Sequence, residues 1–290
     1  MIQFHNVTYT YNFNTDTCKD AIKNINLKIL PGEFLAIIGQ TGSGKSTLVE
    51  HMNGLKKPTV GEVFVSGQDI WQKKFDITKV RFKVGLVFQY PEHQMFEQDV
   101  FSEIAFGLRN NGIAETKIES LIFEALDFVG LPHDILNSSP FDFSGGQKRK
   151  IAIASTIAMQ PDVIILDEPT AGLDPYSSEL LLKKFKDYNK NKGKTVILVS
   201  HSMEEVVRFA DRVIVMHNGE IKMEGEPRKI FTKVEELNEM GLDVPQILKV
   251  FLELRKLGFP ARADIYTVEE AKQEFFRLKN LTKGGKSFVK

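Results

Sequence analysis

The sequence is poor in cysteine and shows no excess of charge of either sign. Cys18 is the only cysteine among the 290 residues, so no disulfide can form within the chain, which suits a reducing compartment. Lysine plus arginine and aspartate plus glutamate both number 38, for a formal net charge of +0. Proteins that bind nucleic acid through its phosphates usually carry a basic excess. The composition therefore argues against a nucleic-acid partner.

Long apolar runs are also missing. No stretch approaches the roughly 20 apolar residues that a membrane-spanning helix needs, and residues 1–11 lack the basic-then-apolar layout of a signal peptide. With 42% hydrophobic residues the chain can still bury a substantial core, which argues against disorder. We expect a chain that is soluble by itself and that takes part in a membrane process only by docking onto the helices of another protein.

Short apolar runs alternate with helical patterns, which predicts an α/β fold with a mostly parallel sheet. The predicted strands cover residues 34–38, 84–88, 163–166 and 195–199, and residues 118–129 have the apolar spacing of an amphipathic helix. Asn218-Gly219 between two strand-like runs predicts a β-hairpin. From Pro227 onward the pattern is helical, with one apolar stripe and a capping box for the last helix (Ile247, Phe251, Leu254 and Leu257; Thr267 to Glu270).

A glycine-rich loop follows the first of these strands. Residues 39–47 read Gly-Gln-Thr-Gly-Ser-Gly-Lys-Ser-Thr and match the phosphate-loop motif G-x-x-x-x-G-K-[ST] between a strand and a helix. Glycines let successive N–H groups point at phosphates. Lys45 is expected to reach the β- and γ-phosphates of ATP, and the Ser46 hydroxyl to ligate Mg²⁺. The other predicted ATP contacts in the loop are Gly39, Thr41, Gly42, Ser43, Gly44 and Thr47. The alternative, a turn without a ligand, is disfavoured by the flanking strand and helix.

The predicted strand over 163–166 ends in two acidic residues, Asp167 and Glu168. Ligands of α/β proteins bind at the carboxyl ends of the strands. Asp167 is therefore a candidate Mg²⁺ ligand, and Glu168 is a candidate base for the attacking water. Taken alone they could equally be two solvated acids. The phosphate loop makes the functional interpretation the better one.

A second candidate anion-binding segment is Ser144-Gly145-Gly146-Gln147, which lies about twenty residues before Asp167. A serine and two glycines that open a helix make an anion-binding helix terminus. One chain thus carries two phosphate-facing elements. They need not face the same site.

With Phe143 in front, this segment resembles the signature motif of ATP-binding-cassette ATPases, although phenylalanine replaces the usual leucine. Other motifs of that family appear in order over roughly residues 1–240: Gln89 at the Q-loop position, Ala171 to Asp174 as the D-loop, His201 as the switch histidine and Tyr11 as the aromatic that stacks on adenine. Tyr9 lies on the same strand and is an alternative to Tyr11.

The resemblance implies a P-loop NTPase fold of the cassette type. It comprises a RecA-like, mostly parallel core, an antiparallel β subdomain, and an α-helical signature subdomain at about residues 91–160. Residues 1–226 would form the ATP-binding domain and 227–290 a small helical extension. The resemblance also implies a head-to-tail dimer with ATP between the chains, so that Ser144, Gly145, Gly146 and Gln147 contact the partner's ATP. Catalysis would fall to Lys45, Gln89, Glu168 and His201, with Mg²⁺ held by Ser46, Gln89 and Asp167.

Residues 90–97, Tyr-Pro-Glu-His-Gln-Met-Phe-Glu, resemble the ATPases of energy-coupling factor transporters, most closely the second, A-prime, ATPase of the pair. This resemblance implies a peripheral protein at the cytoplasmic face of the cell membrane. It would pair with another cassette ATPase, bind a membrane scaffold (the T component) directly and a substrate-binding S component indirectly, and drive uptake of a vitamin or a transition-metal ion.

Two surfaces are candidate contacts in such a complex. Met95 and Phe96 are predicted to contact the scaffold, whereas Phe101 and Phe106 belong either to that groove or to the core of the helical subdomain. In the extension, the stripe with Phe251 either joins the two ATPases or packs on its own cassette. The alternatives to this family are another importer or exporter cassette and a non-transport cassette ATPase of the DNA-repair or chromosome type.

Overall fold

The fold is built on a six-stranded sheet that is parallel except at one edge, where β10 runs antiparallel to β9. The computed structural model describes residues 1–13, 17–90 and 94–283. The strand order is β10-β9-β3-β8-β7-β6. The strands are β3 (Phe34–Gly39), β6 (Val84–Val87), β7 (Val163–Asp167), β8 (Thr195–Val199), β9 (Arg212–His217) and β10 (Glu220–Gly225). The predicted hairpin at Asn218-Gly219 is confirmed, and the four predicted strands agree with the structure to within one residue.

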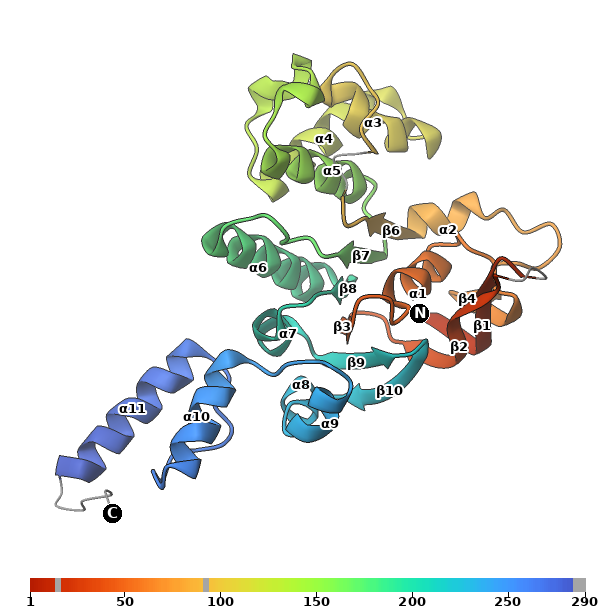
Figure 1. Cartoon of the computed structure of the whole chain (residues 1–290). Coiled ribbons are helices and arrows are strands. Elements are labelled where there is room, and N and C mark those ends of the chain that lie inside the picture. Colours follow the sequence, from red (N-terminus) through yellow and green to blue (C-terminus); the bar gives the residue numbers. More distant parts are fainter. Residues whose placement is uncertain (14–16, 91–93, 284–290) are drawn as a thin grey trace.

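Helices cover both faces of this sheet, and every residue of β3, β7 and β8 is buried. Alternate side chains of a strand face opposite sides. Leu35 packs with α1 (Lys45–Met52), whereas Phe34 packs with α6 (Pro175–Lys192). The sheet is also flanked by α2 (Thr78–Lys83) and α7 (Met203–Phe209) (Figure 1). Because parallel strands end at the same edge, the loops that follow β3, β6, β7 and β8 come together.

A second, antiparallel sheet has the strand order β2-β1-β4-β5. Its strands are β1 (Ile2–Tyr11), β2 (Lys19–Ile29), β4 (Val60–Val65) and β5 (Gln68–Asp69). It shares a core with α1 and one face of the large sheet. The register places Tyr11 opposite Lys19 at the end of β1. This end of the sheet therefore borders the loop that leads into α1 (Figure 1).

Three helices form a unit beside the β6 edge of the large sheet (Figure 1). They are α3 (Val100–Asn110), α4 (Glu115–Val129) and α5 (Gly145–Ala158), with the 3₁₀ turns η2 (His133–Asn137) and η3 (Pro140–Asp142) between α4 and α5. The helix predicted over 118–129 is confirmed as part of α4. Its buried residues share one core with α5 and with the α6 face of the sheet.

The chain after β10 continues as α8 (Pro227–Ile230), α9 (Val234–Glu239), α10 (Gln246–Lys256) and α11 (Val268–Lys283). The capping box of α11 is confirmed, since the Thr267 hydroxyl accepts from Glu270 N at 3.2 Å and the Glu270 carboxylate accepts from Thr267 N at 3.2 Å. The last seven residues of the predicted extension, 284–290, lie outside the described residues. Within the described part of the chain, no helix combines the length and the apolarity that crossing a bilayer requires.

The apolar stripe of α10 packs within the extension itself. Phe251 is buried against α11 and the segment before it, in a cluster with Ala261, Ile265, Ala271 and Leu278, and Ile247 and Leu254 lie beside it. Leu257, at the end of the stripe, is exposed. The prediction that this stripe packs on the cassette or joins two ATPases is therefore wrong for Phe251. The large apolar residues left exposed on α11 are Val268, Phe275, Phe276 and Leu281.

Candidate nucleotide-binding site

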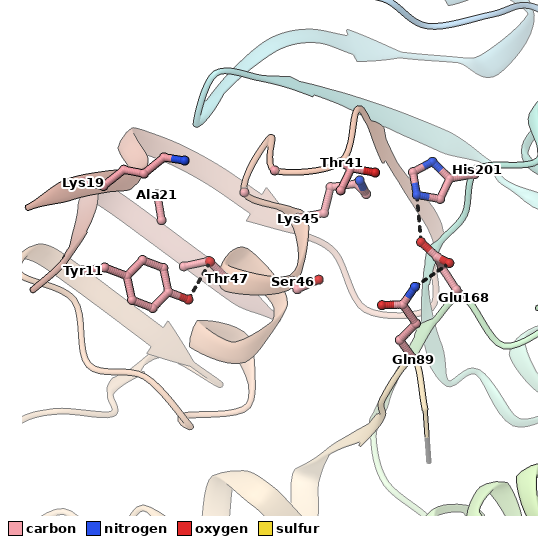
Figure 2. Close-up of a pocket in the computed structure, with 12 residues that line it drawn as sticks. Tyr11, Lys19, Ala21, Thr41, Lys45, Ser46, Thr47, Gln89, Glu168 and His201 are labelled. Atoms are coloured by element: carbon pink, nitrogen blue, oxygen red, sulfur yellow. Dashed lines mark hydrogen bonds and ion pairs between the residues drawn. The ribbon is translucent and has the colours of Figure 1, made fainter. Parts of the chain in front are cut away.

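A cavity of about 510 Å³ opens at the carboxyl edge of the parallel strands. Residues from the loop after β3 form one wall, residues that follow β6, β7 and β8 form the opposite wall, and the ends of β1 and β2 close a third side (Figure 2). The lining residues are Tyr11, Lys19, Ala21, Thr41, Gly42, Gly44, Lys45, Ser46, Thr47, Gln89, Glu168 and His201. Most of the residues predicted to bind or hydrolyse ATP thus surround one cavity.

The loop over 39–47 wraps closely around the start of α1. Gly44 has φ 103°, and a Cβ at this position would lie 2.4 Å from the carbonyl oxygen of Ala21. Only glycine fits both the conformation and the space. Gly44 precedes Lys45, the first residue of α1, so the free N–H groups of this helix terminus face the cavity. Such a terminus binds anions.

Lys45 is held against the loop that carries it. Its ammonium group donates to the carbonyl oxygens of Gly39 at 2.8 Å and Gln40 at 3.1 Å. Burial lowers the pKa of Lys45, and the nearby carboxylates of Glu168 and Asp167 oppose that shift. The cation is thus fixed beside the cavity by its neighbours, which is the placement that contact with a phosphate requires.

The residues predicted to hold Mg²⁺ lie next to one another. The Ser46 hydroxyl donates to the Asp167 carboxylate at 3.1 Å. Asp167 ends β7, and its burial raises the pKa of its carboxyl group, with Ser46 opposing the shift. The amide oxygen of Gln89 points away from Glu168 and into the cavity (Figure 2). A hydroxyl, a carboxylate and an amide oxygen are hard ligands, and a cation would relieve the cost of burying the carboxylate, so these residues fit Mg²⁺.

Glu168 is the meeting point of three loops. One carboxylate oxygen accepts from the side-chain amide of Gln89 at 2.9 Å, and the other lies 2.8 Å from Nε2 of His201. Gln89 follows β6, Glu168 follows β7 and His201 follows β8. All three line the cavity opposite Lys45 (Figure 2). The predicted base and two of its predicted helpers are therefore in direct contact.

Tyr11 lies at the far end of the cavity from Glu168 (Figure 2). Its hydroxyl is 3.2 Å from the Thr47 hydroxyl, and the Lys56 ammonium lies 5.1 Å from the centre of its ring. Tyr9, the alternative on the same strand, is partly buried behind Tyr11 with their rings edge to face at 5.0 Å, and it does not line the cavity. The structure thus favours Tyr11 over Tyr9 as the residue available to a base.

Lys19 and Ala21 also line this end of the cavity, although they belong to none of the predicted motifs. They are on β2, opposite the end of β1, and only the strand register brings them next to Tyr11. No motif in the sequence marks that pairing.

The signature segment forms a capped helix terminus outside the cavity. Ser144 caps α5: its hydroxyl accepts from Gln147 N at 3.4 Å, and the Gln147 side chain accepts from Ser144 N at 3.1 Å. Ser144 and Gly145 are exposed. None of residues 144–147 is among the described residues that line the cavity. The two predicted phosphate-facing elements, the phosphate loop and the signature segment, therefore lie at different places on the chain.

Comparison with known proteins decides the family. Residues 22–171 match the family model of ABC transporters. The chain is 47% identical to the energy-coupling factor transporter ATP-binding protein EcfA2 of Caldanaerobacter subterraneus subsp. tengcongensis, over 97% of this chain and 99% of that protein. It is also 47% identical to EcfA2 of Clostridium perfringens, over 96% and 98% of the two chains. The chain belongs to the ATP-binding-cassette family.

Solved cassettes share its fold. A dimeric post-hydrolysis form of the ATP-binding cassette MJ0796, bound to ADP and Pi, is similar with a TM-score of 0.72 and 32% identity, over 78% of this chain and 99% of that one. The cassette cbiO1 of Clostridium perfringens, part of the ABC transporter complex cbiONQ, has a TM-score of 0.70 and 34% identity, over 82% and 94%. The predicted cassette fold is thus confirmed, and the chain is an ATPase of the energy-coupling factor type.

The prediction that Met95 contacts the membrane scaffold is wrong. Met95 is buried, at 7% exposure, in the core that α3, α4 and α5 share. Phe96 is 59% exposed, and its ring packs edge to face on the exposed Phe106 at 4.8 Å. Phe101 is partly buried against the core. Residues 91–93 of the family-specific segment lie outside the described residues.

Proposed function

We propose that this cassette is one of two ATPases at the cytoplasmic face of an energy-coupling factor transporter, and that it drives uptake of a vitamin or a transition-metal ion. The proposal rests on one observation above all. Glu168 is held by Gln89 and His201 on one wall of the cavity, and Lys45 and Ser46 lie on the facing wall. This arrangement suits hydrolysis of the terminal phosphate of ATP.

In this mechanism the chain's own residues position the reactants. The adenine stacks on Tyr11, and the phosphates lie along the N–H groups of residues 41–47 with Lys45 beside them. A water molecule attacks the γ-phosphorus, and Glu168 takes its proton as the bond to the β-phosphate oxygen breaks. Lys45 offsets the negative charge of the phosphoryl group, while His201 and Gln89 orient the carboxylate. ADP and phosphate are the products.

Mg²⁺ would be held by Ser46, Asp167 and Gln89, and it would offset the charge of the phosphates. Asp167 is suited to this role because its carboxylate is buried and already accepts from Ser46 at 3.1 Å. Replacing Asp167 by asparagine should therefore weaken the binding of Mg²⁺, and raise the Mg²⁺ concentration that hydrolysis needs, without disrupting the fold.

A second ATPase is the partner that this geometry calls for. The signature terminus at Ser144 is exposed and lies outside the chain's own cavity. The similar cassette MJ0796 is dimeric with ADP and Pi. In a head-to-tail dimer each signature terminus would complete the cavity of the other chain, and the exposed Phe275 and Phe276 of α11 offer an apolar face for a contact between the two extensions.

The membrane scaffold would dock beside Gln89. Phe96 and Phe106 form an exposed aromatic pair close in sequence to that residue. An exposed aromatic pair is typical of the anchors at protein interfaces. Movement of Gln89 on ATP binding would reach the scaffold at this point, and the S component, which selects the substrate, would be linked through the scaffold.

The substitution Glu168→Gln tests the proposal in the chain purified with its transporter complex. It keeps the shape of the side chain but removes the base, so ATP should still bind while hydrolysis at this chain's site falls by at least about 100-fold. The matched control is Asp162→Asn at the opposite end of β7, where the carboxylate pairs with Lys194 at 2.8 Å, and this variant should hydrolyse ATP normally.

Uptake of labelled vitamins and transition-metal ions by the reconstituted complex, with identification of the co-purified membrane proteins, tests the transport step. Undiminished hydrolysis by the Glu168→Gln variant would overturn the role of Glu168. Recovery of soluble or DNA-bound partners only would overturn the proposal that the chain serves a transporter.

A further inference from the structure

Arg149 is a buried cation next to the wall of the cavity that carries Gln89 and Glu168, and the proposed mechanism gives it no role. It lies on α5, five residues after the signature serine, and only 5% of its surface is exposed. Among the described residues, its guanidinium group donates to the main-chain carbonyl oxygens of Gln89 at 2.9 Å, Glu168 at 3.4 Å, and Ala171. These carbonyls belong to the loop after β6, the loop after β7, and the start of the D-loop.

The three acceptors are parts of one functional unit. The side chains of Gln89 and Glu168 are already joined at 2.9 Å, and their main-chain carbonyls are joined again through Arg149. A carboxylate keeps its direction only if its backbone is fixed as well as its side chain. Arg149 therefore fixes the backbone from which both the proposed base and its amide partner extend.

The geometry specifically requires an arginine. A guanidinium group is a rigid, planar fork with five donors, whereas a lysine ammonium is a compact charge on a flexible stem. Acceptors on separate loops can be bound together by the fork without movement of the side chain. Lysine at this position would keep the charge but could hold fewer of the carbonyls at once.

We infer that Arg149 is a positioning residue, which ties the signature helix α5 to the backbone of Gln89, Glu168 and the D-loop. A shift of α5 relative to the sheet then changes the direction of the Glu168 carboxylate. In the proposed head-to-tail dimer, the N-terminus of α5 faces the partner's ATP. Arg149 would thus couple this terminus mechanically to Glu168, which is the chain's own base. This inference rests on the proposed function of Glu168.

The test compares Arg149→Lys and Arg149→Gln with a control arginine in the chain purified with its complex. Displacement of a reacting group by about 1 Å can cost about 100-fold in rate. We expect kcat to fall by about 10- to 100-fold in Arg149→Gln and less in Arg149→Lys, with the KM for ATP changed by no more than about twofold. The rates are measured well below the melting temperature of each variant.

Arg212→Lys is the matched control. Arg212 also joins separate elements, with bonds to Glu33 at 2.8 Å and to the carbonyl of Lys28 at 2.8 Å, and it does not line the cavity. Its replacement should lower the melting temperature without lowering kcat. If the Arg149 variants behave like Arg212→Lys, with a lower melting temperature and normal kcat, Arg149 is only structural and the inference is wrong.

A double-mutant cycle separates the inference from the proposed function. If Arg149 acts through Glu168, then Arg149→Gln should cause no further loss of rate once Glu168 is already glutamine. Equal fractional losses in the two backgrounds would overturn the positioning role. Full activity of Glu168→Gln alone would instead overturn the assignment of Glu168, which is a separate result.

Discussion

Glu168 and Asp167 are neighbours in the chain, yet they serve different parts of the site. Asp167 ends β7 in the extended conformation of a strand and contacts Ser46. Glu168 has φ 50°, in the left-handed region, which costs a residue with a Cβ roughly 1–2 kcal/mol. That turn directs its carboxylate to Gln89 and His201 instead. Backbone strain thus separates a candidate metal ligand from a candidate base.

His51 predicts a dependence of stability on pH. Its ring is fully buried on α1, Nδ1 lies 2.7 Å from the carbonyl oxygen of Thr47, and Tyr9 packs edge to face on it. Burial lowers the pKa of His51 from 6.5 to about 4, and the nearby Lys56 adds to the shift. The unfolded chain therefore binds the proton more tightly than the folded chain. The free energy of unfolding should fall as the pH drops from 6.5 through 4, by roughly 2–3 kcal/mol at pH 4.5.

The measurement is urea unfolding of the wild type and of His51→Gln at pH 7.5 and pH 4.5. Glutamine can still donate to the Thr47 carbonyl but does not titrate. The variant should therefore lose roughly 2–3 kcal/mol less than the wild type between the two pH values. His133→Gln is the control, because that histidine is exposed beside Asp127. Parallel losses in the wild type and in His51→Gln would show that His51 does not carry the effect.

At the scale of the elements, the segment that follows α9 makes an unexpected contact with the phosphate loop. Gly241, which follows α9, has φ 65°, and its carbonyl oxygen accepts from the side chain of Gln40 at 3.3 Å. A Cβ at Gly241 would lie 1.6 Å from Nε2 of Gln40. The carbonyl of Gln40 in turn accepts from Lys45 at 3.1 Å. Two hydrogen bonds thus link Gly241, in the predicted extension, to the ammonium group of Lys45, which is expected to contact ATP.

Gly241→Ala should therefore weaken ATP binding. The added methyl group must displace the Gln40 side chain, and alanine is strained at this φ by roughly 1–2 kcal/mol. We expect a lower melting temperature together with an increase in the Kd for ATP of about 3- to 10-fold. Gly258→Ala is the matched control, because Gly258 has φ 88° but has no atom near its Cβ position. An unchanged Kd in Gly241→Ala would refute the link to the phosphate loop.

The elements that depend on local sequence could be predicted, and the contacts between distant segments could not. The strands over 163–166 and 195–199 were foreseen because a buried parallel strand is a short apolar run. The polar residues before Met95 predict that it contacts the scaffold, but its burial is set by packing on α3, α4 and α5. No local pattern in the sequence marks Arg149, because these acceptors lie 19, 22 and 60 residues away in sequence. Its role depends on the topology of the sheet.

Considered as a whole molecule, the chain has two candidate anion-binding helix termini that do not share a cavity. The terminus of α1 lines the cavity with Lys45 and Ser46, whereas the terminus of α5 at Ser144 is exposed elsewhere. If the second terminus serves the partner's ATP, a substitution there damages the partner's site and spares the chain's own. Two ATPases in one complex then need each other even though each has a complete phosphate loop.

Ser144→Arg tests this division of labour. The bulky cation removes the cap of α5 and blocks its N-terminus, but it lies outside the chain's own cavity. The isolated variant should bind ATP with the Kd of the wild type, whereas hydrolysis at the partner's site of the two-ATPase complex should fall by at least about 10-fold, because that site loses its second anion contact. Ser120→Arg, on the exposed surface of α4, adds the same charge to the same helical unit and should leave both properties unchanged. A loss of ATP binding by the isolated Ser144→Arg chain would mean that Ser144 serves the chain's own site, and the head-to-tail arrangement would have to be abandoned.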